Sequence, residues 1–209
     1  MGLVFYLHLG RILRVKRERD GTRPMDTRAH ALGIVAELKA VLLEVDPHEV
    51  EELVGAVLGA EKVFFVGVGR VFLALQFLAK RMAHLGIDAQ VVGSVTEKPI
   101  SQADLLIVGS GSGESRVPIA VAEMAKGRGA TVALITSAPS STLRGIADLV
   151  VVVPCPTRID PLQGVHSVQP MTNLFDQALH LLGDAITMRI MELNHIRGQD
   201  LWKLHANLE

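Results

Sequence analysis

Residues 104–116 read DLLIVGSGSGESR, and the rest of the chain can be placed around this stretch. The uninterrupted apolar run at residues 105–108 is typical of a strand that is buried on both faces of a parallel sheet. Glycines and serines follow it directly, and apolar residues then recur at helical spacing, at Val117, Ala120, Val121 and Met124. The stretch therefore predicts a buried strand, a tight turn at its carboxyl end, and the start of a helix.

The composition of this turn indicates a binding site for a phosphate group. Glycine lets the backbone adopt positive φ angles and approach a ligand closely, and serine supplies short hydroxyl donors. The start of a helix adds unpaired backbone N–H groups and the positive end of the helix dipole. The candidate ligand contacts are Ser110, Gly111, Ser112, Gly113, Glu114 and Ser115.

A plain strand-to-helix loop, rich in turn residues, is the alternative interpretation of the same stretch. Two other motifs are excluded. The stretch is not a nucleophile elbow, because no serine in it has glycines two residues before and two residues after. It is not a Walker loop, because it does not end in Gly-Lys-Ser/Thr.

Composition and charge exclude several classes of protein. The chain has 209 residues, 49% of them hydrophobic, which predicts one domain with a terminal extension. A formal net charge of −1 gives no reason to expect nucleic acid or a membrane surface as partner. The lone Cys155 cannot form an internal disulfide, which favours a cytoplasmic enzyme. No metal-binding spacing is present, and no apolar run approaches the ~20 residues of a membrane span.

Residues 1–24 differ from the rest of the chain. They carry six of the 21 Lys and Arg residues and only two of the 22 Asp and Glu residues. The positive charges follow a short apolar opening instead of preceding it, so the segment does not read as a signal peptide. Two interpretations stay open: a disordered basic arm, or a start codon assigned too early, with Met25 as the true first residue. The domain itself is expected to span residues 25–209.

The remaining chain alternates strands and helices. Apolar stripes predict two helices before any strand, which we expect to form an N-terminal helical hairpin, and a long helix at residues 171–194. The five expected strands are residues 62–66, 89–92, 105–108, 130–136 and 148–153. Such alternation predicts a doubly wound, five-stranded parallel α/β sheet flanked by helices. Ligands of these sheets bind outside the carboxyl ends of the strands.

A second glycine-rich turn, Gly67-Val68-Gly69-Arg70, follows the first strand. A dinucleotide-binding interpretation fails, because Phe72 occupies the third glycine position and no acidic residue follows the second strand. The turn still brings Arg70 and the backbone amides near Gly69 to the same sheet edge as the serine turn. Asp176, near the start of the long helix, reads from the pattern alone as a solvated acid favoured by the helix dipole.

Several motifs together resemble the sugar isomerase (SIS) domain family, and within it the 6-phospho-3-hexuloisomerases. They are Ser110-Gly-Ser-Gly-Glu-Ser115, Arg81-Met-Ala-His-Leu-Gly86, Gln169-Pro170-Met171 with Leu174-Phe175, and the closing His205-Ala-Asn-Leu-Glu209. The likeness runs from about residue 33 to residue 209. The first motif marks an SIS domain, and the combination with the last two points to the hexuloisomerases, which have an SIS-type, flavodoxin-like fold.

The resemblance implies a cytoplasmic homotetramer without metal or organic cofactor. It would interconvert D-arabino-3-hexulose 6-phosphate and D-fructose 6-phosphate in the ribulose monophosphate pathway of formaldehyde fixation. The carboxylate at Asp176 would be the base, and His205 would reach the site of a neighbouring subunit as acid or proton carrier. The serine turn would hold the phosphate, and Gly69 and Arg70 would complete the site.

Three departures from the family pattern leave two alternatives open, namely an isomerase of another sugar phosphate or a non-catalytic, sugar-phosphate-sensing SIS domain. Val71 replaces a serine and removes a hydroxyl. Asp176 replaces a glutamate that is one methylene longer, and a displacement of ~1 Å can cost on the order of a hundredfold in rate. Lys98 stands where the family has small polar residues near the site. His166, in the loop before the long helix, is a further possible ligand contact.

Overall fold

The computed structural model of the protein describes residues 26–208, and the compact unit begins at Leu32. The predicted extension at residues 1–24 lies outside the described residues. Five parallel strands form one sheet in the order β2-β1-β3-β4-β5. Their bounds are β1 Val63–Val66, β2 Ala89–Val91, β3 Leu105–Gly109, β4 Thr131–Thr136 and β5 Leu149–Val152. This confirms the predicted doubly wound α/β sheet, and the strand order is the flavodoxin-like one.

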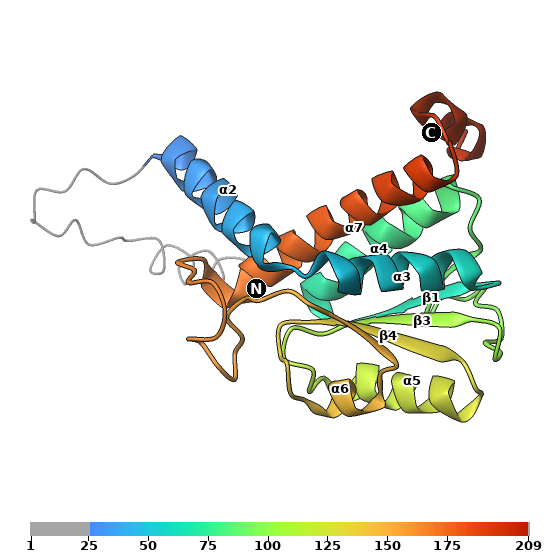
Figure 1. The fold of residues 1–209 in the computed structure, drawn as a ribbon, viewed down its shortest axis with the longest axis horizontal. Helices are drawn as coiled ribbons and strands as arrows, with labels where there is room; N and C mark the ends of the chain where they lie inside the picture. Colours follow the sequence, from blue (N-terminus) through green and yellow to red (C-terminus); the bar gives the residue numbers. More distant parts are fainter. Residues whose placement is uncertain (1–25, 209) are drawn as a thin grey trace, which may run out of the picture. The chain divides into compact units, whose positions relative to one another are not determined.

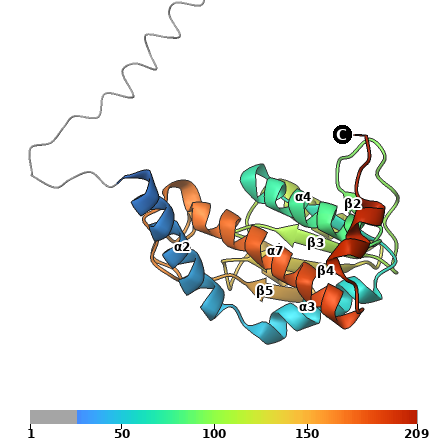
Figure 2. The ribbon, with the colours of Figure 1, turned by 90° about the horizontal axis from the view of Figure 1, so that it is seen from above.

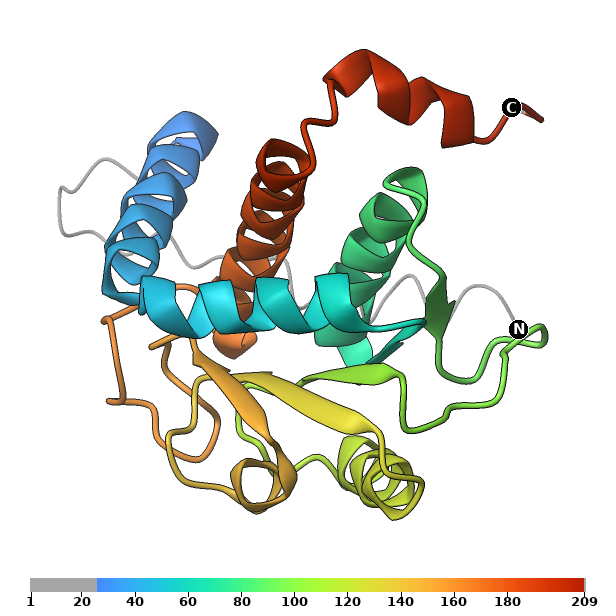
Figure 3. The ribbon, with the colours of Figure 1, turned by 45° about the vertical axis from the view of Figure 1, so that its right-hand side comes forward.

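Helices cover both faces of the sheet (Figure 1). One face carries α5 (Arg116–Gly127) and the short α6 (Thr142–Ile146), and the other carries α3 (Pro47–Gly59), α4 (Gly69–His84) and α7 (Asn173–Leu193). Seen from above in Figure 2, α4 and α7 run side by side, and Figure 3 shows α3 on the same face. Two helices precede the first strand, as the sequence predicts, since α2 (Thr27–Glu44) comes before α3.

The strands read as continuous apolar runs because both of their faces are buried. In β1, Val63 and Phe65 belong to the core cluster under α3, α4 and α7, while Phe64 and Val66 belong to the cluster under α5. Successive side chains of a strand point to opposite faces, so a run without polar interruptions supplies two cores at once. The fold therefore has two apolar layers with the sheet between them.

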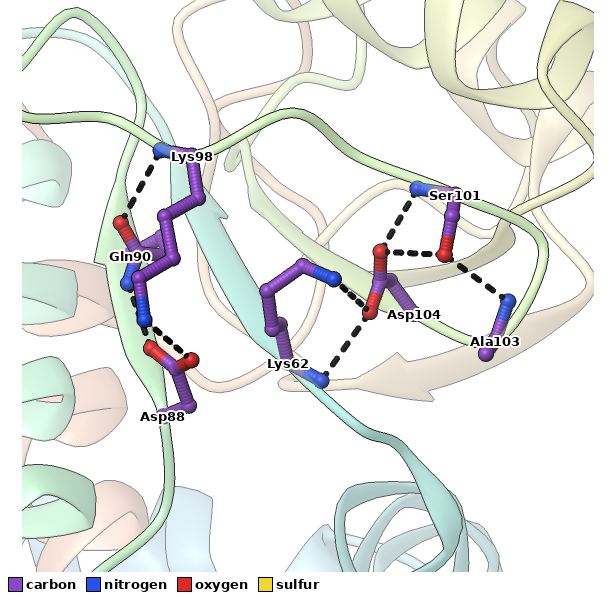
Figure 4. A network of polar contacts seen from close by, with 7 residues as sticks. All are labelled: Lys62, Asp88, Gln90, Lys98, Ser101, Ala103 and Asp104. Carbon is purple, nitrogen blue, oxygen red and sulfur yellow. Dashed lines mark hydrogen bonds and ion pairs between the residues drawn. The ribbon is translucent and has the colours of Figure 1, made fainter.

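A buried carboxylate fixes the amino-terminal edge of the sheet, opposite the predicted site (Figure 4). Asp104 is only 2% exposed and accepts hydrogen bonds from the Lys62 backbone N–H and from the backbone and hydroxyl of Ser101. The Lys62 ammonium lies 3.0 Å away. Burial alone raises the pKa of Asp104, but the bonds from Ser101 and Lys62 outweigh it and leave the pKa below its ordinary value. The network joins the starts of β1 and β3.

Lys98 belongs to this end of the sheet too, which corrects the expectation that it stands near the site. Its ammonium lies 2.7 Å from an Asp88 carboxylate oxygen, and its backbone N–H donates to Gln90 (Figure 4). Asp88 directly precedes β2, so the lysine points back to the amino end of that strand. The sequence interpretation was wrong because it placed the Lys98 ammonium near the site from the position of Lys98 after β2. The long side chain instead reaches back to the carboxylate of Asp88.

The ends of α7 also differ in detail from the prediction. The helix begins at Asn173 after a short 3₁₀ turn, η1 (Pro170–Thr172), and a second 3₁₀ helix, η2 (Gly198–Leu204), follows it. Thr172, at the N-cap position of α7, adopts a left-handed conformation and makes no side-chain capping bond. Its hydroxyl donates to the Met171 carbonyl instead.

Candidate functional site

The turn after β3 is held closed by its own serine and glycine residues. Gly113 has a φ of +67°, and an added Cβ would lie 2.1 Å from the Ser141 hydroxyl, so only glycine fits there. The buried Ser110 hydroxyl accepts from the Gly113 N–H at 3.1 Å and lies 3.2 Å from the Ser115 hydroxyl. Ser110 therefore shapes the turn, and its exposure to a ligand is small.

A cavity of about 190 Å³ opens beside this turn. Its lining residues are Val71, Gly111, Ser112, Pro156, Thr157, Arg158, Thr172 and Phe175. An added Cβ at Gly111 would lie 3.3 Å from the Phe175 ring, so the bare backbone lets the turn pack closely against α7. Val71 forms part of the wall, so this cavity is where the serine hydroxyl of the family pattern is replaced by an apolar side chain. The volume suits a phosphate group and part of a sugar.

Glu114, a predicted ligand contact, is engaged elsewhere. One carboxylate oxygen accepts from the Thr142 backbone N–H and the other from the Thr142 hydroxyl, both at 2.7 Å. Hydrogen bonds from the Thr142 backbone and side chain lower the pKa of Glu114. The side chain thus ties the serine turn to the start of α6, while its backbone stays part of the turn.

The clearest candidate for chemistry is the ion pair between Arg70 and Asp176. The Arg70 Nε–H donates to an Asp176 Oδ2 at 3.0 Å, and the aspartate side chain is 9% exposed whereas the arginine side chain is 61% exposed. Burial raises the pKa of Asp176, and the hydrogen bond and charge of Arg70 lower it only in part, so the pKa lies above its ordinary value. The pattern-based interpretation of a solvated acid is wrong, because packing of α7 against α4 removes this carboxylate from water.

Arg70 and Asp176 line a second, larger cavity of about 450 Å³ between α4 and α7. Its other lining residues are mostly apolar: Leu38, Leu73, Ala74, Phe77, Gln177, His180 and Leu181. Arg70 and Asp176 are the chain neighbours of Val71 and Phe175, which line the cavity at the serine turn. The two cavities therefore lie near each other along α4 and α7.

The backbone that leads into this region has an unusual conformation. Met171 and Thr172 both have positive φ angles, 55° and 61°, which residues other than glycine rarely adopt. Strain of this kind persists only where the surroundings enforce it, and it gathers at functional sites. Glu37 of α2 holds the preceding loop by accepting from Ser167, Val168 and Gln169.

His205 is not near the ion pair of its own chain. Its ring stacks on His84 with centroids 5.3 Å apart, at the carboxyl end of α4. Arg70 lies at the other end of that helix, and 14 residues at 1.5 Å each separate the two ends by about 20 Å. Within one chain the structure thus brings Arg70, Asp176 and the serine turn to one sheet edge and leaves His205 outside. Gly69, with a φ of +58°, opens α4 at that edge.

Some lining residues were missed from the sequence. Thr157 and Arg158 come from a proline-rich loop without periodicity, and Phe77 and His180 lie within α4 and α7. His166, which was expected as a further ligand contact, is exposed and interacts electrostatically with Glu37. Among the described residues, no three His, Cys, Asp or Glu side chains gather as a metal site would require. Across residues 26–208, every helix is too short or too polar to cross a membrane.

Comparison with known proteins identifies the family. A family model for the SIS domain matches residues 57–181. The chain belongs to the SIS domain family. This chain is 37% identical over 174 residues to the 3-hexulose-6-phosphate isomerase of Mycobacterium gastri, and the match covers 83% of this chain and 86% of the relative. It is 32% identical over 185 residues to the 3-hexulose-6-phosphate isomerase of Bacillus subtilis (strain 168), covering 88% of this chain and 100% of the relative.

A solved structure supports the fold of this SIS domain. A protein from Methanococcus jannaschii, for which the function of 3-hexulose-6-phosphate isomerase has been inferred, superposes with a TM-score of 0.75 at 23% identity. The match covers 86% of this chain and 99% of that one. At 23% identity, the similarity between the two structures shows a shared fold and nothing further.

Proposed function

We propose that this SIS domain, which we take to span residues 25–209, is an isomerase that interconverts D-arabino-3-hexulose 6-phosphate and D-fructose 6-phosphate. One observation carries the proposal: a buried carboxylate with a raised pKa, Asp176, lies at the carboxyl edge of the sheet next to a serine-glycine turn. The two relatives that carry the name 3-hexulose-6-phosphate isomerase support the choice of substrate.

The reaction moves a carbonyl from C3 to C2 of the sugar. A base takes the proton from C2, an enediolate forms across C2 and C3, and C3 then receives a proton while the C2 oxygen becomes the carbonyl. Asp176 is our candidate for the base. Burial raises its pKa above the ordinary value, which increases its affinity for the proton that it would take.

Arg70 can serve both the base and the developing oxyanion. Its Nε–H holds Asp176, and the two Nη groups remain as donors on a side chain that is largely exposed. A guanidinium at this position would stabilise negative charge on the enediolate oxygens. We assign the phosphate of the substrate to the cavity at Gly111 and Ser112, with the amides at Gly69 and at the start of α5 as further donors.

We further propose a homo-oligomer, a tetramer by the resemblance above, in which His205 of one copy completes the site of another. The distance between His205 and Asp176 within a single chain favours this arrangement. Exposed apolar side chains on both segments favour it too: Trp202 and Leu204 beside His205, and Leu73 and Phe77 at the cavity of Asp176. We place the enzyme in the cytoplasm, in the ribulose monophosphate pathway of formaldehyde fixation.

The direct test is a coupled assay with a hexulose phosphate synthase, in which formation of D-fructose 6-phosphate is followed. We expect turnover by the purified chain without added metal or cofactor. No turnover of this substrate, but turnover of another ketose or aldose phosphate, would redirect the assignment within the isomerases. Binding of sugar phosphates without any turnover would instead identify a sensor.

A further inference from the structure

The cavity at the serine-glycine turn has a second wall, formed by the loop between β5 and α7. The turn contributes Gly111 and Ser112, and the loop contributes Thr157 and Arg158. Thr172, at the start of α7, adds another hydroxyl. Of the residues that line this cavity, all of which lie within the described chain, Arg158 alone carries a charge. The cavity thus joins one cation to hydroxyls and backbone amides, which are the groups that bind a phosphate dianion.

The guanidinium of Arg158 is not committed to another group in the described part of the chain. No hydrogen bond or ion pair of Arg158 occurs within residues 26–208, whereas Arg70 pairs with Asp176 and Arg81 with Asp184. Its five N–H donors are therefore available to a ligand in the cavity.

The backbone at Arg158 is fixed although it lies in a loop. The buried Thr157 donates its backbone N–H to the Asp160 carbonyl at 2.9 Å, and its hydroxyl accepts from the Asp160 N–H at 2.8 Å. Pro156 and Pro161 restrict the backbone on either side of this turn. The long side chain thus starts from a defined point beside the cavity, which limits the entropy lost when it closes on a ligand.

We propose that Arg158 is a binding residue for the phosphoryl group, which it grips together with Ser112 and the backbone of the turn. A planar guanidinium can donate two parallel hydrogen bonds to two phosphate oxygens. The role deepens the proposed function and rests on it for the identity of the sugar, but the phosphate contact itself can be measured without turnover. Arg158 offsets part of the charge of the dianion, whereas Arg70 is already engaged with the candidate base.

The test compares Arg158→Gln with Arg128→Gln, which removes the same charge at the far end of α5. Loss of a charged hydrogen-bonding partner should raise the KM for D-fructose 6-phosphate by roughly tenfold to a hundredfold, with kcat changed by less than about threefold. Arg158→Lys should recover part of the loss, because lysine keeps the charge without the fork. Arg128→Gln should behave like the unchanged protein.

Inorganic phosphate provides a readout that does not need catalysis. Phosphate should raise the Tm of the unchanged protein and of Arg128→Gln, and should raise that of Arg158→Gln much less. The assignment of Arg158 is wrong if Arg158→Gln has an unchanged KM and an unchanged phosphate-induced rise in Tm while Ser112→Ala has a raised KM and a smaller rise in Tm. In that case the proposed function still stands. If the protein turns over no sugar phosphate, the proposed function fails and the Tm comparison still decides the role of Arg158.

Discussion

At the scale of single residues, the proposed chemistry rests on the pairing of Asp176 with Arg70. A carboxylate at the start of a helix is normally kept acidic by the helix dipole. Here burial acts in the opposite direction and raises the pKa, while Arg70 offsets part of the rise. The ion pair therefore limits how far burial raises the pKa of this carboxylate.

The opposing effects of burial and Arg70 on the pKa of Asp176 lead to a prediction for the Arg70→Gln variant. Removing the guanidinium removes the contribution that lowers the pKa of Asp176, so that pKa rises further. Because only the ionised carboxylate can act as a base, the acid limb of the kcat/KM profile should move to higher pH, and the maximal rate should fall on the order of a hundredfold. A series of kcat/KM measurements across pH checks both effects.

Arg81→Gln is the matched control, because Arg81 lies on the same helix and pairs with another aspartate of α7, Asp184. The acid limb of the kcat/KM profile of Arg81→Gln should lie at the same pH as that of the unchanged protein. An acid limb that moves to lower pH in Arg70→Gln, or an equal shift in Arg81→Gln, would contradict the coupling between Arg70 and the base.

At the same scale, the sequence could name the residues of the site better than their surroundings. The turn at Ser112 and the acid at Asp176 were predicted from composition and family motifs, and the structure brings them to one edge of the sheet. Whether the acid was solvated could not be read from the chain, because its burial arises from packing between α4 and α7, about a hundred residues apart in sequence. Nothing in the sequence predicted that Arg158 lines the cavity, because its position depends on a loop without periodicity.

At the scale of elements, the strands were the most predictable part of the molecule. Short apolar runs bounded by turn residues are typical of strands buried in a parallel sheet, and their alternation with helices favours right-handed crossovers between parallel strands. The loop before α7 was not predictable. Its shape depends on contacts with α2, some 130 residues away in sequence.

Glu37 is the centre of these contacts and provides a second prediction. Burial raises the pKa of Glu37, but hydrogen bonds from Ser167, Gln169 and Val168 outweigh it and lower the pKa below its ordinary value of 4.5. Glu37→Gln should reduce the free energy of unfolding by about 1–3 kcal/mol. Because the loop leads into Met171 and Thr172, the variant should also lower kcat/KM, although Glu37 is outside both cavities' lining residues.

The pH dependence of this effect has a defined sign. A carboxyl group with a depressed folded pKa stabilises the protein above its unfolded pKa, and the contribution is lost as the pH falls through the folded pKa. The difference in Tm between the unchanged protein and Glu37→Gln should thus be constant at neutral pH and shrink below pH 4.5. Glu44→Gln, an exposed site on the same helix, should show no difference in Tm at any pH. A gap that widens in acid would refute this role of Glu37.

At the scale of the whole molecule, His205 lies far from Asp176 of its own chain, and we propose that it completes the site of another copy. If His205 of one subunit serves Asp176 of another, a mixture of Asp176→Asn and His205→Ala proteins contains some sites in which both residues are intact. Random assembly of equal amounts gives about a quarter of such sites. We therefore expect two inactive proteins to regain roughly that fraction of activity when they are unfolded and refolded together.

The control for this experiment is the same mixture without exchange of subunits, which should stay inactive. Sedimentation of the refolded mixture should show a single oligomeric species. Absence of any recovered activity in a mixture that has demonstrably exchanged subunits would place His205 outside the active site, while the role of Asp176 would be unaffected.

The central claim is that the buried carboxylate of Asp176 moves a proton in a bound sugar phosphate, and turnover and binding by Asp176→Asn test it most directly. Asparagine keeps the shape and removes the base. We predict that turnover, followed by NMR of the sugar phosphate, falls about a thousandfold, while D-fructose 6-phosphate binds within a few fold of normal affinity. Asp184→Asn, further along the same helix, should keep full turnover. Turnover of Asp176→Asn within a few fold of the unchanged protein would contradict the account.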